Sequence, residues 1–335
     1  MIKPKHTHSK KELSVKEYVK GLSEGDISIL GRAITLVEST LLTHQELAQN
    51  ILEQSMPLTG NSVRIGITGV PGVGKSTFIE SFGTHLTTLG KKVAVLAVDP
   101  SSEQGKGSIL GDKTRMEKLS IDPLAFIRPS PNAGSLGGVA RKTRESILLC
   151  EAAGYDVIII ETVGVGQSET AVNSMVDFFL LLMLAGAGDE LQGIKRGIME
   201  MADVLAITKA DGDNLNKSKS AVGDYKRALH LLPAKSNNWI PKVLTCSAYE
   251  NGGISEIWET IQTFVNHNIS NNTFDDNRKK QAQFWLHESI QEQLGNYFYK
   301  KSEVKENLAL LEKEVLKGKL SPFIAANKLI ELFKK

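Results

Sequence analysis

No feature of the chain constrains its fold more than residues 69–76, which read Gly-Val-Pro-Gly-Val-Gly-Lys-Ser and follow the apolar run Val63 to Thr68. This is a complete G-x-x-x-x-G-K-S phosphate loop, placed between a strand and a helix as such loops require. Its backbone N–H groups and the positive end of the following helix suit phosphate oxygens. Lys75 is predicted to reach the β- and γ-phosphates, and the Ser76 hydroxyl to hold Mg²⁺. The predicted phosphate-binding residues are Gly69, Val70, Pro71, Gly72, Val73, Gly74, Lys75, Ser76 and Thr77.

The identity of the base is indicated by Thr208-Lys209-Ala210-Asp211, which follows the apolar run Val204 to Ile207 and varies the guanine-reading N/T-K-x-D signature. A carboxylate at Asp211 can accept hydrogen bonds from N1–H and the 2-amino group of guanine, whereas adenine would leave it unpaired. Ser247-Ala248, at the end of a later strand, resembles the element whose backbone amide meets guanine O6. The sequence therefore predicts GTP and GDP as ligands. The predicted base-side residues are Thr208, Lys209, Asp211, Ser247, Ala248 and Tyr249.

Two acidic residues stand at the ends of predicted strands. Glu161 begins Glu-Thr-Val-Gly after the run Val157 to Ile160, where most GTPases carry Asp-x-x-Gly, and Asp99 ends the run Val93 to Val98. The carboxyl ends of parallel strands converge on one crevice, so both acids are predicted to lie near the Mg²⁺ shell. Gly164 is predicted to contact the γ-phosphate through its amide. Glutamate in place of aspartate indicates a subgroup outside the Ras-like majority.

Six motifs occur in order along the chain: G-V-P-G-V-G-K-S-T, V-D-P-S-S, G-S-I-L-G-D-K-T-R-M, G-G-V-A-R-K-T-R-E, E-T-V-G-V-G-Q-S-E and G-A-G-D-E-L-Q-G-I-K-R-G-I-M-E. Together they resemble the MeaB/ArgK/MMAA family, and the resemblance runs from about Leu30 to the C-terminus. These are metallochaperone GTPases that protect and load adenosylcobalamin-dependent acyl-CoA mutases, typically methylmalonyl-CoA mutase. The resemblance implies an α/β fold with a doubly wound, mostly parallel sheet of the SIMIBI-type P-loop GTPase class, with helical extensions at both ends.

The resemblance also implies roles for individual residues. The catalytic set is Lys75, Asp99, Asp112, Glu161 and Gln167, and the Mg²⁺ set is Ser76, Asp99, Asp112 and Glu161. Gln167 either positions water or is a solvated loop residue. Asp189 and Lys195 lie in a segment that, in the resembling family, senses the nucleotide and contacts the mutase. Four arginines either neutralise charge on the γ-phosphate or a partner, or are plain surface charges: Arg115, Arg141, Arg144 and Arg196.

Three departures from the family pattern bear on the detail of the switch segments. Residues 103–106, Glu-Gln-Gly-Lys, lack the expected proline and doubled glycine. Ala185 stands where proline is usual, and Thr208 replaces the commoner asparagine. These departures leave the predicted nucleotide unchanged.

Composition excludes several classes of function. The chain has 335 residues with 40 basic and 38 acidic side chains, and this balance favours neither nucleic acid nor a membrane surface as partner. The longest apolar run, Phe178 to Ala185, is far below the roughly 20 residues that span a bilayer. Cys150 and Cys246 are predicted to be buried and reduced. Met1 to Glu12 lacks the apolar core of a secretory signal and the arginines of a transit peptide, so we expect a bacterial, cytoplasmic protein.

Three regions are predicted: a helical N-terminal extension at 1–60, a GTPase domain at 61–266 and a helical dimerisation arm at 275–335. Ser14 to Gln54 has helical apolar spacing, at Leu30, Ile34, Val37, Leu41, Leu42 and Leu47. Asn266 to Asn277 is polar and is predicted to be a linker. The arm has apolar stripes at Phe284, Trp285, Leu286, Ile290, Leu294 and Tyr297, and at Leu308, Leu311, Val315 and Leu316. In the resembling family such an arm reaches a second subunit, so we expect a homodimer.

The sequence thus predicts a homodimeric GTPase that gates cobalamin delivery to, and protection of, an acyl-CoA mutase. One alternative is a nickel-type metal-insertion GTPase, which would need Cys or His clusters, whereas the chain has only two cysteines. Another is a kinase of an arginine/ornithine transport system, which would need a second site for a hydroxyl or histidine acceptor. No such site is apparent in the sequence.

Overall fold

The computed structural model describes residues 13–98, 116–129, 136–162, 168–186 and 196–334. By its contacts the chain divides into two compact units, Met1–Lys279 and Lys280–Lys335. No helix in the described ranges is both long and apolar enough to cross a membrane.

The first unit is built on a parallel sheet of seven strands in the order β3-β2-β4-β1-β5-β6-β7. Its strands are β1 (Val63–Gly69), β2 (Val93–Val98), β3 (Ala125–Arg128), β4 (Val157–Thr162), β5 (Phe178–Met183), β6 (Val204–Ile207) and β7 (Lys242–Thr245). Strands β2, β4, β5 and β6 are buried along their whole length, as apolar runs covered on both faces require. The predicted doubly wound parallel sheet is confirmed.

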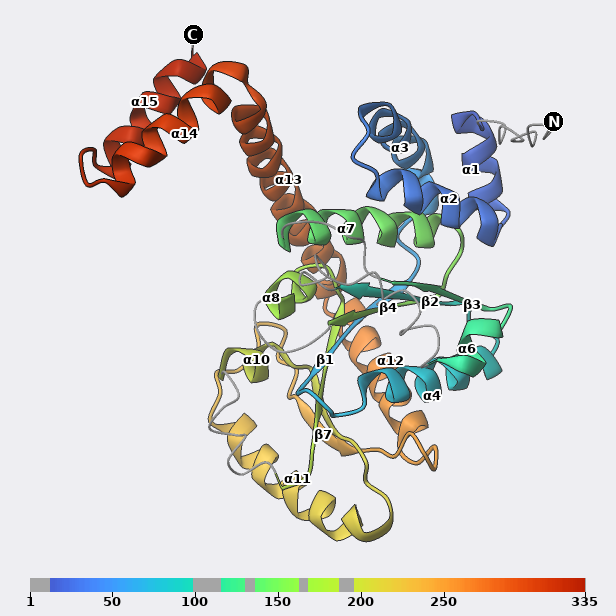
Figure 1. The fold of residues 1–335 in the computed structure, drawn as a ribbon. Helices are drawn as coiled ribbons and strands as arrows, with labels where there is room; N and C mark the ends of the chain where they lie inside the picture. The colour runs from blue at the N-terminus through green and yellow to red at the C-terminus, as the bar shows by residue number, and fades with distance from the viewer. Residues whose placement is uncertain (1–12, 99–115, 130–135, 163–167, 187–195, 335) are drawn as a thin grey trace, which may run out of the picture. The chain divides into compact units, whose positions relative to one another are not determined.

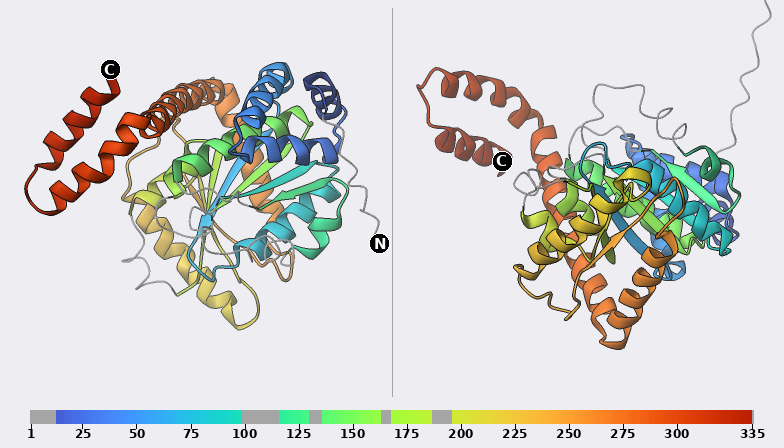
Figure 2. Two further views of the ribbon diagram at one scale, coloured as in Figure 1. Left: turned by 45° about the horizontal axis from the view of Figure 1, so that its top comes forward. Right: turned by 90° about the horizontal axis from the view of Figure 1, so that it is seen from below.

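Helices cover both faces of the sheet, with α7 and α8 on one face and α4 and α12 on the other (Figure 1). The helical segments of this part are α4 (Lys75–Thr88), α6 (Glu117–Ile121), α7 (Leu136–Ala152), α8 (Ser168–Asn173), α10 (Arg196–Met201), η3 (Gly212–Asn214), α11 (Leu215–His230) and α12 (Ile254–Ser270). Figure 2 shows the same sandwich from two further directions. Cys150 on α7 and Cys246 after β7 are both buried and free, as predicted.

Three N-terminal helices pack on the outer side of α7: α1 (Val15–Ser23), α2 (Ile27–Glu38) and α3 (Leu42–Ser55), followed by the short helix η1 (Met56–Leu58). Ser14 and Glu17 form a capping box at the start of α1, and Asp26 caps α2. Of the predicted apolar positions, Leu30, Ile34 and Val37 are buried. Leu41 and Leu42 are exposed instead, because they mark the turn into α3 rather than its packed face.

The predicted linker at Asn266–Asn277 is wrong. Helix α12 continues to Ser270 and α13 (Thr273–Lys300) begins three residues later. The polar residues are used for structure: Asn268 is buried, and its Oδ1 accepts hydrogen bonds from Asn237 Nδ2 at 2.9 Å and Thr273 Oγ1 at 2.7 Å. The chain reverses at Asn272, whose φ of 57° is the left-handed conformation that asparagine tolerates.

The second unit contains α13 from Lys280 onward, α14 (Ser302–Leu316) and α15 (Pro322–Lys334). Helices α14 and α15 pack against each other, with Val304, Ala325 and Leu329 buried. The Phe333 ring lies edge-on to Tyr297 at 5.5 Å, and its carbonyl accepts a hydrogen bond from Lys301 Nζ at 2.8 Å.

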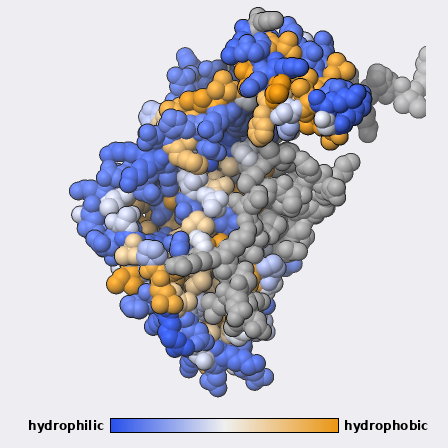
Figure 3. Space-filling view, turned by 90° about the vertical axis from the view of Figure 1, so that its left-hand side faces the viewer, coloured by the Kyte–Doolittle hydropathy of each residue, from blue (hydrophilic) through white to orange (hydrophobic). Residues whose placement is uncertain are grey.

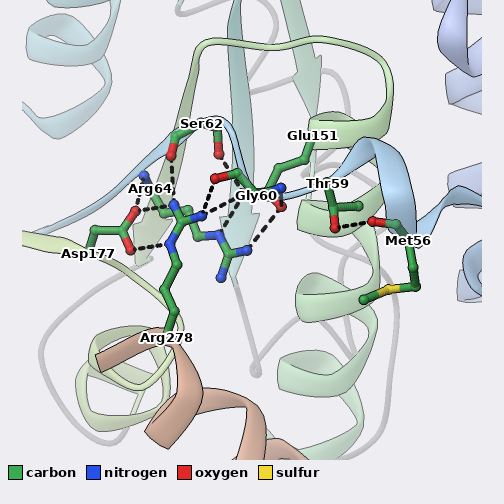
Figure 4. Close-up of polar contacts among 8 residues, drawn as sticks. All are labelled: Met56, Thr59, Gly60, Ser62, Arg64, Glu151, Asp177 and Arg278. Atoms are coloured by element: carbon green, nitrogen blue, oxygen red, sulfur yellow. Dashed lines mark hydrogen bonds and ion pairs between the residues drawn. The ribbon is translucent and has the colours of Figure 1, made fainter. Parts of the chain in front are cut away.

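A clasp of two arginines and two carboxylates lies at the start of β1 (Figure 4). Arg64, Glu151 and Asp177 are buried, and the Arg278 side chain is 14% exposed. Arg64 donates two hydrogen bonds to Glu151, at 2.9 and 3.0 Å. Arg278, from the first turns of α13, donates two to Asp177, at 2.9 and 2.7 Å. Each pair has the two-pronged geometry that makes arginine–carboxylate contacts strong.

Backbone groups complete the clasp and connect its elements. Arg278 also donates to the carbonyls of Gly60 at 2.7 Å and Ser62 at 2.6 Å. Glu151 accepts from the Ser62 hydroxyl at 2.6 Å, and Asp177 from the Arg64 amide at 2.8 Å. Burial alone would raise the pKa of Glu151, but the hydrogen bonds and charge of Arg64 hold it below its ordinary value. Strand β1, helix α7, the turn before β5 and helix α13 are therefore joined by fully compensated charges.

Candidate nucleotide site

The phosphate loop lies at the carboxyl end of β1, the central position where doubly wound sheets bind ligands. Gly72 and Gly74 have φ of 76° and 89°, left-handed values that a side chain would strain. A Cβ on Gly69 would lie 2.6 Å from the Leu182 carbonyl of β5, so glycine is needed for this close approach. Helix α4 begins at Lys75, directly after Gly74. Residues 69–76 thus form the turn predicted from the motif.

Lys75 is half-buried, and its ammonium donates to the Gly69 carbonyl at 3.1 Å. Burial lowers the pKa of the Lys75 ammonium, while the charges of Glu161 and Glu169 act in the opposite direction. Because the ammonium is partly desolvated and held by its own loop, a polyphosphate anion that binds there would stabilise its charge. The side chain is therefore placed and charged for phosphate binding.

Ser76 and Glu161 come together beside the loop, where the Ser76 hydroxyl donates to Glu161 Oε1 over 3.4 Å. Glu161 is buried at the end of β4, next to β1. These are two hard oxygen donors of the kind that Mg²⁺ takes. Within the described part of the chain no three His, Cys, Asp or Glu side chains are grouped as a metal site. The other two predicted metal ligands, Asp99 and Asp112, lie outside the described residues.

The base-side loop is fastened to the phosphate loop. The Thr208 hydroxyl, buried after β6, donates to the Val73 carbonyl at 2.8 Å and to the Met183 carbonyl at 3.3 Å. Lys209, with a left-handed φ of 55°, donates from Nζ to the Gly72 carbonyl at 2.9 Å. Threonine at 208 therefore connects the two loops although asparagine is commoner in the signature.

Asp211 is the residue predicted to read guanine, and Ser247 orients its carboxylate. The Ser247 hydroxyl donates a short hydrogen bond to Asp211 Oδ2 and accepts one from the Glu250 amide at 3.0 Å. The backbone joins the same two segments, since the Ala210 amide donates to the Cys246 carbonyl at 3.0 Å. Ala248 is half-buried next to Ser247. Tyr249, also predicted on the base side, is 90% exposed.

The other predicted residues fall into two groups. Outside the described residues lie Asp99, Asp112, Arg115, Gly164, Gln167, Asp189 and Lys195, and the side chain of Arg196 is also not described. On α7, the Arg141 guanidinium pairs with Glu145 at 3.2 Å, while Arg144 is only 6% exposed. Arg144 is therefore not the plain surface charge that one interpretation of the sequence suggested.

Glu169 was missed by the sequence reasoning. It is 2% exposed at the start of α8, and its charge favours the protonated form of Lys75. The signal available was its position at the end of the E-T-V-G-V-G-Q-S-E motif. Glu169 therefore contributes to the electrostatics of Lys75, the lysine predicted to bind phosphate.

A family model described as methylmalonyl Co-A mutase-associated GTPase MeaB matches residues 30–303 of the chain. A putative GTPase of Caulobacter vibrioides is 51% identical over 93% of this chain and 95% of that protein. The GTPase ArgK of Escherichia coli (strain K12) is 50% identical over 86% of this chain and 87% of its own length.

Two further matches carry other names. The mitochondrial methylmalonic aciduria type A homolog of Mus musculus is 47% identical over 97% of this chain and 81% of that protein. A crystal structure described as an LAO/AO transport system kinase is 40% identical, with a TM-score of 0.76, and covers 97% of this chain and 99% of that one. The fold is therefore shared with that structure along nearly the whole length of both chains.

Proposed function

Because this chain belongs to the family of methylmalonyl-CoA mutase-associated GTPases, MeaB, we propose that its GTP hydrolysis gates the loading of adenosylcobalamin into an acyl-CoA mutase and protects that enzyme. Methylmalonyl-CoA mutase is the mutase we propose. The observation that carries the proposal is the match of the MeaB model over residues 30–303, which includes the nucleotide site. The name of the mouse relative, a methylmalonic aciduria type A homolog, agrees with it.

For the nucleotide, we propose that Asp211 pairs with guanine and that Mg²⁺ is held by Ser76 and Glu161, with Asp99 and Asp112 from outside the described residues. The Ser247 hydrogen bond to Asp211 supports the first assignment, because it fixes the carboxylate that must meet the base edge. The 3.4 Å approach of Ser76 to Glu161 supports the second. GTP should therefore bind much more tightly than ATP in a calorimetric titration, and equal affinities would contradict this assignment.

The proposed reaction is phosphoryl transfer from GTP to water. The loop amides and Lys75 stabilise the negative charge that collects on the transferred phosphoryl group. When bound, Mg²⁺ supplies further charge neutralisation at the phosphates. Burial lowers the pKa of Lys75, and the charges of Glu161 and Glu169 oppose that effect. We propose Gln167, or one of the acids, for positioning the water, and Asp189 and Lys195 for sensing the nucleotide.

We propose a homodimer formed through the second unit. On α13, the side chains of Leu286, Ile290, Leu294 and Tyr297 are 58, 45, 58 and 68% exposed. Their spacing of three and four places them on one side of a helix, and Gln281 is the only buried residue of α13. Figure 3 shows how such groups of hydrophobic side chains interrupt a mainly hydrophilic surface on one face of the molecule. An apolar stripe of this kind is typical of a surface that a second chain covers.

The dimer is tested without removing Arg278, which belongs to the clasp. The double variant Leu286→Asp/Leu294→Asp should be a monomer in light scattering and should bind GDP as tightly as the wild type. Glu292→Gln, a matched change at a half-buried position of the same helix, should remain dimeric. A dimeric double variant would contradict the proposed interface.

The mutase role is tested by affinity capture from the native lysate. The immobilised full-length protein should retain an adenosylcobalamin-dependent mutase, and the amount should differ between GDP and a non-hydrolysable GTP analogue. Identification is by mass spectrometry. Recovery of no mutase with either nucleotide would count against the role, while leaving the GTPase assignment intact.

The solved structure of a relative is described as a transport system kinase, and a kinase would form a different product from a GTPase. With GTP labelled at the γ-phosphate, a GTPase releases all label as inorganic phosphate, whereas a kinase transfers label to a protein. We propose that all label is released as inorganic phosphate. We also propose that the protein acts in the cytoplasm. A nickel-insertion role would require stoichiometric Ni²⁺ binding, which equilibrium dialysis of the purified protein measures directly.

A further inference from the structure

A cavity of about 690 Å³ lies beside the edge strand β7, at the end of the sheet opposite the nucleotide site. It is lined by residues of α10, the end of α11, residues 232–235 and 238–241, and β7. Figure 1 labels α10, α11 and β7. Lys242 starts β7 in this cavity, whereas the other end of the strand leads to Ser247. The volume is in the range of about 300–1,000 Å³ that small-molecule sites have.

The floor of the cavity is held rigidly. The Trp239 indole is 8% exposed, donates to the Asp203 carbonyl at 2.9 Å and lies edge-on to Phe264 at 5.1 Å. Lys235 forms a buried ion pair with the Asp203 carboxylate and donates to the Met201 carbonyl at 2.9 Å. A site whose aromatic floor cannot rotate is organised before a ligand arrives.

The walls combine apolar surface with positive charge. Leu229, Leu232 and Val243 supply aliphatic surface around the Trp239 ring. Lys226 and Lys242 add ammonium groups, and Lys242 lies 5.6 Å from the centre of that ring.

The charges on the lining do not cancel. Three lysines line the cavity against one carboxylate, Glu200, and Lys235 is committed to Asp203. The ligand chemistry that matches is an apolar or aromatic body with an anionic group.

Two elements that line the cavity, α11 and β7, and the neighbouring strand β6 have their other end at the nucleotide site. Asp203, which holds Trp239 and Lys235, directly precedes strand β6, and Thr208 directly follows that strand. Helix α11 starts just after the loop of Asp211 and ends in the cavity. Strand β7 runs from Lys242 toward Ser247. A ligand that shifts the cavity wall therefore acts on the segments that hold the base-reading carboxylate.

We propose that this cavity binds a small organic anion with an apolar body, and that its occupancy changes the rate of guanine nucleotide release. The cavity is distinct from the nucleotide site, and the proposal does not depend on a mutase partner.

The test uses two probes of similar aromatic shape on the full-length protein saturated with GDP and Mg²⁺. The anionic probe is 8-anilinonaphthalene-1-sulfonate, and the neutral one is N-phenyl-1-naphthylamine. Calorimetry should show that the sulfonate binds at least tenfold more tightly than the amine. In Lys226→Gln/Lys242→Gln this ratio should fall below threefold. Lys217→Gln, on the opposite side of α11, should keep the wild-type ratio.

The proposed effect of the ligand on nucleotide release is tested by measuring the release rate of a fluorescent GDP analogue. A saturating concentration of the sulfonate should change the release rate at least twofold in the wild type and leave it unchanged in the double variant. A sulfonate-to-amine ratio that is the same in all three proteins would overturn the binding site. Tight binding without any effect on release would overturn the coupling. If the double variant instead retains the wild-type ratio but loses response to a mutase, the cavity is a protein-docking surface and not a small-molecule site.

Discussion

The two ends of β1 are built on opposite principles. At its carboxyl end the chain forms the phosphate loop from backbone amides, left-handed glycines and a lysine whose pKa is lowered by burial. At its amino end the clasp of Arg64, Glu151, Asp177 and Arg278 pairs every charge with an opposite one. The carboxyl end therefore offers amide and ammonium donors to a ligand, whereas the charges at the amino end are already paired with one another. Function and stability are thus separated along a single strand.

The separation makes a prediction about mutations at the clasp, where the largest effect is expected. Glu151→Ala removes the carboxylate that accepts two hydrogen bonds from the buried Arg64 guanidinium, and this should lower the free energy of unfolding by about 3–5 kcal/mol. The affinity of the folded fraction for GDP should stay within about twofold of the wild type. Urea unfolding and a fluorescent-GDP titration measure the two quantities.

The matched control for this variant is an ion pair on the surface. Asp224→Ala removes the partner of Arg227, whose side chain is 76% exposed, and should change stability by less than about 1 kcal/mol. If Glu151→Ala weakens GDP binding as strongly as it weakens the fold, the two ends of β1 are not independent.

The opposite pattern is expected at the phosphate loop. Lys75→Ala removes a charged donor to phosphate and should cost about 2–5 kcal/mol of nucleotide binding, at least thirtyfold in affinity. Stability without nucleotide should remain within about 1 kcal/mol, because the lost ammonium is partly desolvated. Lys91→Ala, an exposed lysine beyond the end of α4, is the control for loss of positive charge. A large loss of stability in Lys75→Ala would assign a structural role to this end as well.

A change at the residue proposed to select the base should weaken nucleotide binding less than the loss of Lys75. Asp211→Asn should weaken GDP binding by about 1–3 kcal/mol and improve binding of xanthosine diphosphate, whose 2-carbonyl accepts from the new amide. Competition titrations with both diphosphates give the ratio directly. A loss of both affinities in parallel would mean that Asp211 shapes the loop and does not read the base.

The smallest effect is expected at the contact between the two nucleotide loops. Thr208→Val removes the hydrogen bonds to the Val73 and Met183 carbonyls and should weaken GDP binding by about 0.5–1.5 kcal/mol. Thr208→Asn, which restores the commoner residue, should bind within about twofold of the wild type. An asparagine variant as weak as the valine variant would show that the loop contact depends on the threonine shape.

The same comparison explains how far the sequence could be interpreted. The phosphate loop, the base loop and strands β1, β2, β4, β5 and β6 were predictable, because motif and apolar run lie together in the chain. Strand β3 was not identified from the sequence, because it is a short edge strand without a buried run. Its residues Phe126, Ile127 and Arg128 are only half-buried. The clasp was invisible because its four members lie far apart in the sequence and carry no spacing signal.

Two further misses have physical causes. The polar composition of Asn266–Asn277 suggested a linker, but a buried asparagine network satisfies those side chains within helices. Glu169 was not singled out from the sequence, because only the fold brings its charge near Lys75. Composition predicts exposure on average, whereas individual polar residues become buried when specific partners satisfy them.

The most direct test of the central claim is the steady-state GTPase rate of the full-length protein with and without a purified adenosylcobalamin-dependent mutase. We predict slow hydrolysis alone and a clear increase with the mutase. We also predict that Lys195→Ala keeps the basal rate and loses the increase. A rate that the mutase leaves unchanged in the wild type would contradict the proposed coupling of GTP hydrolysis to the mutase.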